Sequence, residues 1–307
     1  MSAERTAETA RENQSRREIS RIVAGGYEDY QRVRLATMNR IRDIIRKLNE
    51  GISFDEVEEK KDEKTFDRAY QDANLGATLS KMLAEGRISE TLYDHIMDTM
   101  GLAEDAQKLE AKHARNMTKF ITGEPIWEEF LVHVRGIGPV IATQLIKEYG
   151  YGERYDTISN MWGNSGLSVT QEGLAPTKAK GEKAGFDPDK RTLSAYKIGE
   201  LFIKHNSPIY RDVYDKTKAR ELVRMEDETD EHRPKSRMHA HNRARRKMVK
   251  LFLSHYWEAG RTIMGLPTRT PYAEGYLGHT SIIHYDEVIK SNTKAKAAKA
   301  TTAEATS

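Results

Sequence analysis

Apolar residues recur along this chain at spacings of three and four, and this periodicity constrains the fold more than any other feature. Alternating runs of β-branched residues, which are typical of strands, are nearly absent. We therefore predict an all-α protein. The clearest stripe precedes Gly51 and consists of Tyr27, Tyr30, Met38, Ile41, Ile45 and Leu48.

The composition divides the chain into four parts. Residues 1–24 are polar and rich in Ala, Arg and Glu, so we expect a disordered or frayed segment. Residues 25–123 are expected to form a helical N-terminal domain. Residues 124–286 are expected to form a second helical domain, which contains a helix-hairpin-helix and a Gly-rich irregular insertion. Residues 287–307 are expected to be a disordered basic tail. The expected helices span residues 64–84, 89–100, 103–121, 126–150, 190–206, 207–225 and 238–264.

Several classes of protein are excluded by composition. The chain has 307 residues and no Cys, so it has no disulfide framework and no Cys-ligated metal. No stretch approaches the ~20 apolar residues of a membrane span. We expect a cytoplasmic protein without a membrane partner, associated with the nucleoid if it binds DNA. The long apolar stripe before Gly51 lacks an assured partner within the chain, and a homodimer through the N-terminal helices is a further expectation.

The segment of residues 126–149 reads as two helices joined by a hairpin that contains two glycines. The first helix turns an apolar face inward, and so does the second. Gly136 and Gly138 permit φ above zero, and Pro139 suits the first position of a helix. The residues expected to face inward are Ile126, Phe130, Leu131, Val134, Ala142, Leu145, Ile146 and Tyr149.

A hairpin of this kind exposes backbone amides at the positive end of a helix, where they bind phosphate. The segment resembles the helix-hairpin-helix motif of DNA-binding proteins, which holds the backbone without reading bases. On that resemblance Gly136, Ile137 and Gly138 supply the amides, and Arg135 and Lys147 are the neighbouring cations. The alternative interpretation is an ordinary turn between two closely packed helices.

A second signal is the basic segment of residues 232–250, which holds eight Lys or Arg and no acid. The whole chain carries 50 Lys and Arg against 47 Asp and Glu, so the remainder is net negative, with 42 basic against 47 acidic residues. A helix here presents one basic face, which predicts one localised polyanion-binding surface. An acidic run at residues 226–231 is expected to screen it when no ligand is present. The predicted nucleic-acid contacts on this segment are Arg237, Arg243, Arg246, Lys247 and Lys250.

The order of motifs resembles the C-terminal domain of the insertion-sequence transposases that pair a RuvC-like DEDD nuclease with a helical domain, and their archaeal relatives most of all. The likeness covers roughly residues 128–261 and includes the hairpin, the stretch Tyr155–Gly163 and the segment His239–Arg261. It implies a DNA-binding domain shared with mobile-element recombinases. Members of that family also bind structured RNA, so RNA remains an open alternative.

Two departures from the family bear on catalysis. The N-terminal region offers no strands for the nuclease carboxylates, and Ala179 and Lys180 stand where the family has a serine before a glycine. Ser165 is the nearest other serine followed by glycine. We therefore name no catalytic residue and lean against an enzyme. Strand transfer by an active or residual recombinase is the first alternative.

Other chemistry is weighed against simpler interpretations. A helix-hairpin-helix repair glycosylase would place its catalytic Asp near Asp156, which otherwise reads as a helix N-cap. His239 and His241 invite a metal site, but their spacing puts the two rings on opposite sides of a helix. Neither a Walker loop nor a dinucleotide fingerprint is present. We expect no metal and no cofactor.

Overall fold

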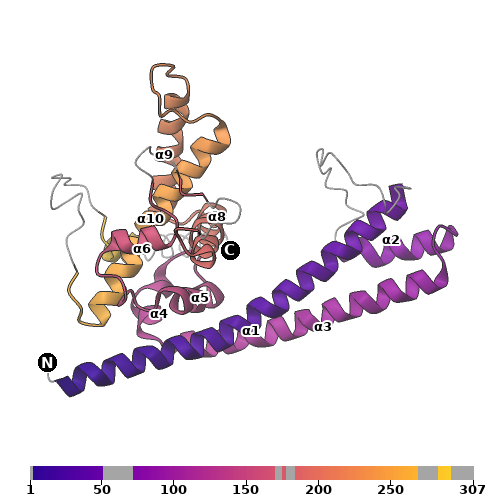
Figure 1. Cartoon of the computed structure of the whole chain (residues 1–307), viewed down its shortest axis with the longest axis horizontal. Helices are drawn as coiled ribbons and strands as arrows, with labels where there is room; N and C mark the ends of the chain where they lie inside the picture. The colour runs from indigo at the N-terminus through magenta and orange to yellow at the C-terminus, as the bar shows by residue number, and fades with distance from the viewer. Residues whose placement is uncertain (1–2, 51–71, 170–174, 178–183, 269–282, 292–307) are drawn as a thin grey trace, which may run out of the picture. The chain divides into compact units, whose positions relative to one another are not determined.

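The protein is all helical over the part of the chain described by the computed structural model (Figure 1). Every regular element in these stretches is a helix, which confirms the predicted fold class. None of the described helices is long and apolar enough to cross a membrane. The described stretches are residues 3–50, 72–169, 175–177, 184–268 and 283–291.

The chain folds into two compact units. One comprises Ile22–Asn116, and the other comprises Met1–Arg21 together with Met117–Ser307. We refer to Ile22–Asn116 as the small unit and to the remainder as the large unit. The sequence placed its corresponding divisions at residues 24 and 123.

The segment of residues 1–24, which we expected to be disordered or frayed, is helical from Ala3 onward and belongs to α1 (Ala3–Glu50). The prediction from polar composition was wrong, because a few contacts within the large unit hold this part of the helix in place. Ser20 is fully buried, and the Arg16 guanidinium lies 3.3 Å from the Glu124 carboxylate. Glu124 also accepts a hydrogen bond of 2.6 Å from the Tyr151 hydroxyl.

The small unit packs α1 against α2 (Asp72–Ala84) and α3 (Glu90–Ile121) (Figure 1). The stripe that begins at Tyr27 supplies its core together with residues from both other helices. The helix predicted from residue 64 starts in a segment outside the described residues. The core residues are Met38, Ile41, Ile45, Leu75, Leu79, Met82, Ile88, Ile96 and Ala103.

Two expectations for this unit change. The helices predicted at 89–100 and 103–121 form one continuous α3, since Ile96 and Ala103 on either side of Gly101 are buried in the same core. That burial outweighs the cost of about 1 kcal/mol for a glycine inside a helix. The stripe on α1 is covered by α2 and α3, so the observation that suggested a homodimer has an explanation within one chain. The homodimer stays a prediction without that support.

The large unit is organised around α10 (Arg237–Ile263), the 27-residue helix that pairs along its first half with α9 (Tyr210–Met225) (Figure 1). The shorter elements of the unit are α4 (Pro125–Glu129), η2 (Leu131–His133), α5 (Pro139–Tyr149), α6 (Ile158–Asn164), α7 (Pro188–Arg191), the π-helical η3 (Thr192–Ile198) and α8 (Gly199–Lys204). Helix α10 also contacts α4, α6, η3 and α8.

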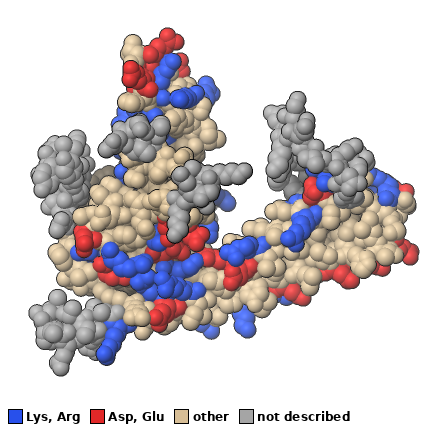
Figure 2. Space-filling model, viewed as in Figure 1, with Lys and Arg blue, Asp and Glu red and all other residues tan. Residues whose placement is uncertain are grey.

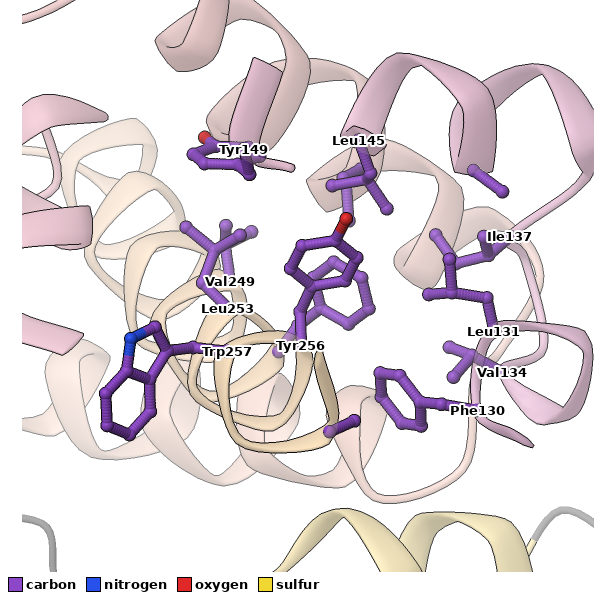
Figure 3. Close-up of a cluster of buried hydrophobic side chains, with 14 of the residues drawn as sticks. Phe130, Leu131, Val134, Ile137, Leu145, Tyr149, Val249, Leu253, Tyr256 and Trp257 are labelled. Carbon is purple, nitrogen blue, oxygen red and sulfur yellow. The ribbon is translucent and has the colours of Figure 1, made fainter. Parts of the chain in front are cut away.

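The core of this unit joins the hairpin segment to the second half of α10 (Figure 3). Phe130 and Phe252 stack with ring centroids 6.4 Å apart, and the Tyr256 hydroxyl donates to the Gly150 carbonyl at 2.5 Å. Gly260 permits this approach, because a Cβ there would lie 2.3 Å from the Tyr151 carbonyl oxygen. The hairpin is therefore part of a continuous core and not a loop at its edge.

A short helix over residues 285–291 packs on this core through the fully buried Val288. His255 holds the residues that lead into this helix. The Nδ1 atom of His255 lies 2.8 Å from the Tyr210 hydroxyl, and the Nε2 atom lies 2.7 Å from the Ile283 carbonyl. Residues 287–291 are thus ordered in a region where we expected a disordered tail. The rest of that expected tail, residues 292–307, lies outside the described residues.

Candidate nucleic-acid interface

The hairpin has the predicted inward faces. All eight residues predicted to face inward are buried to 1% exposure or less. The first helix is shorter than predicted, because α4 ends at Glu129 and a 3-10 turn, η2, replaces its second half. Pro139 begins α5 with Gly138 as its N-cap, as the sequence indicated.

The two glycines have different roles. Gly136 has φ of +100°, a conformation that side chains with a Cβ rarely adopt, and an added Cβ would lie 3.4 Å from the Leu201 carbonyl oxygen. Gly138 has an ordinary φ of −102° and does not use the positive φ that a glycine permits. An added Cβ at Gly138 would meet nothing within 4 Å. Gly136 therefore shapes the turn, whereas Gly138 leaves the start of α5 open.

The predicted phosphate donors are partly free. The Ile137 amide donates to the Val134 carbonyl at 3.0 Å and is engaged within the turn. Pro139 at the first position of α5 has no amide hydrogen, and its N-cap Gly138 provides no side-chain acceptor for the amides that follow. Arg135 is half-buried and forms no ion pair with another described residue. Lys147 differs from the prediction, because its ammonium lies 3.2 Å from Glu148.

The basic face of α10 separates into two sets of cations. In the first set each cation already has an acidic partner. Arg243 lies 3.1 Å from the buried Glu221 and also donates to His239 at 3.1 Å. Arg245 lies 2.5 Å from Glu200. Arg243, which we predicted as a phosphate contact, is therefore part of an ion pair between α9 and α10.

In the second set no described acid lies within ion-pair distance. It consists of Arg246 and Lys250 on α10 and, from the end of α7, Arg191. Burial lowers the pKa of Arg246, and the nearby charges of Arg191 and Arg243 lower it further. Burial also lowers the pKa of Lys250, and Arg246 adds to the effect. We call these three residues the cation cluster.

Aromatic rings contact two cations of this cluster. The Lys250 ammonium lies 4.1 Å from the centroid of the Trp162 ring, and the Arg191 guanidinium lies 4.6 Å from that of Phe186. Arg191 also donates to the Pro176 carbonyl at 2.7 Å. These contacts are consistent with cations held in place before any ligand arrives.

Acids next to the cluster are occupied by other lysines. Lys190 pairs with Asp187 through a short contact, and its ammonium lies 3.8 Å from Glu148. Asp187 caps α7 by accepting from the amides of Asp189 and Lys190. Both carboxylates therefore pair with Lys190, and no ion pair joins either of them to Arg191 in the described structure.

The remaining predicted cations lie away from the cluster or stand exposed. Lys247 is exposed on α10 without an ion pair to a described acid. Arg237 is exposed at the first residue of α10, nine residues or about 14 Å along the helix from Arg246. Within the described residues no contact joins Arg135 or the hairpin glycines to the cluster, so we treat the hairpin and the cluster as two sites.

The acidic run of residues 226–231 does not screen the cluster by direct pairing. Acidic side chains gather at the tip of the α9–α10 pair, at the top of Figure 2. There Asp230 pairs with Arg224 at 2.6 Å, and Asp227 accepts from the Thr229 hydroxyl. No acid of the run pairs with Arg246 or Lys250 in the described structure.

The arrangement of the described residues does not support the catalytic serine, the glycosylase aspartate or the metal site that were considered as alternatives. Ser165 is fully buried, donates to the Met161 carbonyl and lies 2.9 Å from the Tyr149 hydroxyl. Asp156 is exposed, and Thr157, one residue later, is the N-cap of α6. Within the described ranges no group of three or more His, Asp or Glu side chains is arranged to hold a metal ion.

Sequence reasoning missed two residues of this region. Arg191 lies in a short helix more than fifty residues before Arg246, and nothing in the sequence indicates that the two meet. Tyr196 is 47% exposed on η3, and the Arg245 guanidinium lies 5.0 Å from its ring centroid. The tyrosines that follow the hairpin, Tyr149, Tyr151 and Tyr155, are buried.

Comparison with known proteins adds no relative. No protein-family model matches the sequence, and neither a curated protein nor a solved structure is significantly similar to it.

Proposed function

We propose that this protein binds DNA by its phosphate backbone, through the cation cluster of Arg191, Arg246 and Lys250. The observation that carries the proposal is the accumulation of three cations with no acidic partner among the described residues, of which Arg246 and Lys250 are partly desolvated. Neighbouring like charges oppose one another, and burial adds a further cost for Arg246 and Lys250. A polyanion would relieve both costs, because its phosphate oxygens supply the missing acceptors.

The hairpin is the second element of the proposal. The amides at the start of α5, which have no side-chain cap, and the half-buried Arg135 suit one backbone phosphate. Neither element presents a set of side chains for reading base edges. We therefore propose binding with little sequence specificity.

The proposed relation to insertion-sequence transposases rests on the order of sequence motifs alone. It favours DNA over other polyanions, with structured RNA as the alternative ligand. We do not propose strand transfer, since Ala179 and Lys180 stand where the family has a serine before its glycine.

The test is a fluorescence-anisotropy titration of a 30-base-pair duplex with the full chain at about 100 mM salt. We expect the double substitution Arg246→Glu with Lys250→Glu to weaken binding by at least a hundredfold. Lys112→Glu with Arg115→Glu is the matched control. It reverses one Lys and one Arg at exposed positions of α3 that form no ion pair with a described acid.

Equal losses of affinity in the two double variants would contradict the proposal, because the loss would then depend only on the net charge of the protein and not on the cation cluster. A duplex affinity unchanged by Arg246→Glu with Lys250→Glu would also contradict it. An RNA hairpin of equal charge, titrated in parallel, decides between the two nucleic acids. If RNA binds more tightly than DNA at the same salt concentration, the proposed ligand is RNA and not DNA.

A further inference from the structure

Tyr196 occupies an unusual place for a large aromatic side chain. It lies on η3, the stretch Thr192–Ile198 in which the helix widens to a π-helix. Its neighbours Leu193 and Ile198 are buried, whereas Tyr196 is 47% exposed. Large aromatic side chains normally gain most by burial, and π-helical turns occur often at functional sites.

One cation holds the tyrosine ring in place. The Arg245 guanidinium lies 5.0 Å from the ring centroid. That guanidinium is itself fixed, since it donates to Glu200 at 2.5 Å and to Asn242 at 2.9 Å. Gly199 makes the arrangement possible, because a Cβ there would lie 2.8 Å from the Arg245 Cδ. The ring is therefore pre-positioned at the surface by a fully paired arginine.

A second cation connects the ring to the cation cluster. Arg246 follows Arg245 on α10 and interacts electrostatically with both Tyr196 and Arg191. Unlike Arg245, it has no acidic partner among the described residues. The exposed aromatic ring thus adjoins the edge of the surface that we propose for phosphate.

We infer that the Tyr196 ring stacks on an unpaired DNA base, an inference that rests on the proposed function. The phosphate next to that base would then contact Arg246 and Lys250. An aromatic ring beside backbone-binding cations is the arrangement by which proteins hold unstacked nucleotides. In an intact duplex the faces of each base are covered by its neighbours, so a ring at a protein surface cannot reach them. The preferred substrate is therefore DNA with a gap, flap or single-stranded stretch.

The inference is tested with two DNA ligands of equal length, an intact duplex and a duplex with a three-nucleotide gap. The gap carries one 2-aminopurine, whose fluorescence falls when the base stacks. The wild-type chain is expected to bind the gapped ligand about tenfold more tightly and to quench the 2-aminopurine. Tyr196→Leu is expected to lose about tenfold in affinity for the gapped ligand, to lose the quenching, and to change duplex affinity less than twofold.

Tyr196→Phe is the matched control and keeps both the gapped affinity and the quenching, since the ring and not the hydroxyl carries the contact. Because Tyr196 is exposed, both variants are expected to fold, and circular dichroism checks this. Equal losses for Tyr196→Leu on gapped and intact DNA would overturn the stacking role. A loss in Tyr196→Phe as large as in Tyr196→Leu would also overturn it.

Failure of the underlying function gives a different result. If Arg246→Glu with Lys250→Glu leaves the affinity for both DNA ligands unchanged, the phosphate site is wrong and the stacking assignment falls with it. If that variant weakens both ligands while Tyr196→Leu weakens neither, the phosphate site stands and only the stacking role of Tyr196 is rejected. Quenching by a single-stranded RNA probe at lower protein concentration than DNA would overturn the choice of DNA.

Discussion

The Lys250 ammonium lies 4.1 Å from the centroid of the Trp162 ring, while the Trp162 indole N–H donates to the Lys250 backbone carbonyl at 3.0 Å. The two residues therefore make two contacts, one through the Lys250 side chain and one through the Lys250 backbone. This pair joins α6 to α10 at the edge of the cation cluster. A cation fixed in this way loses less conformational entropy when it meets a phosphate.

We expect Trp162→Leu to weaken duplex binding by about threefold to tenfold, because Lys250 loses its cation–π contact and its backbone anchor. The measurement is anisotropy at fixed salt, with urea unfolding in parallel. Trp127→Leu is the matched control, since Trp127 packs on the same core from α4. It is expected to lower stability without changing affinity. Unchanged affinity in Trp162→Leu would show that the contact does not position Lys250 for DNA.

The lowered pKa of Lys250 predicts how binding depends on alkaline pH. In the free protein Lys250 loses its proton at a lower pH than an ordinary lysine. DNA prefers the charged form, so affinity should fall as pH rises through that lowered pKa. Lys250→Arg, which stays charged, is expected to remove this decline. Identical alkaline profiles for the wild type and Lys250→Arg would contradict the assignment.

Protein stability is expected to fall with acid because of His255. Burial lowers its pKa from 6.5 to about 4, despite its hydrogen bond with the Ile283 carbonyl. In the unfolded chain His255 binds a proton as the pH falls through about 6.5, whereas in the folded protein it binds the proton only near pH 4. Stability is therefore complete above pH 6.5 and declines between pH 6.5 and 4, by roughly 3 kcal/mol in total.

Urea unfolding at several pH values measures this decline. His255→Gln should be less stable at pH 7.5, because it disturbs the link between Tyr210 and residues 283–291. Its stability should also change less between pH 6.5 and 4 than that of the wild type. Parallel pH profiles for the two proteins would mean that other groups cause the acid sensitivity.

The hairpin glycines should respond differently to the same substitution. Gly136→Ala is expected to destabilise the fold by about 1 to 3 kcal/mol, since its φ of +100° is strained for alanine and the Leu201 carbonyl oxygen lies 3.4 Å from the new Cβ. Gly138→Ala, with open space and an ordinary φ, should change stability by less than about 0.5 kcal/mol. Urea unfolding of both variants checks the contrast, and equal losses would show that the turn does not depend on Gly136.

The helical periodicity predicted the all-α fold and the inward faces of the hairpin because burial of one face is a local property of sequence. Phe130 and Tyr149 are buried for the reason their spacing indicated. Composition was a poorer guide at residues 1–24, where single contacts such as the Arg16–Glu124 ion pair hold a polar helix. Gly101 likewise predicted a break that packing on both sides prevents.

The candidate site was predicted only in part. The sequence identified the basic face of α10, but not which of its cations have acidic partners. Glu221 neutralises Arg243 from another helix, and Arg191 joins Arg246 from a distant segment. Such pairings depend on tertiary structure, and local spacing carries no signal for them.

The salt dependence of duplex affinity tests the central claim most directly. Each phosphate neutralised contributes a slope of roughly −0.9 to log K against log salt concentration. We expect a steep negative slope for the wild-type chain between about 50 and 200 mM salt. Arg246→Gln with Lys250→Gln should make it shallower by roughly 2. A flat wild-type slope, or a slope unchanged by the two substitutions, would contradict backbone binding by the cation cluster.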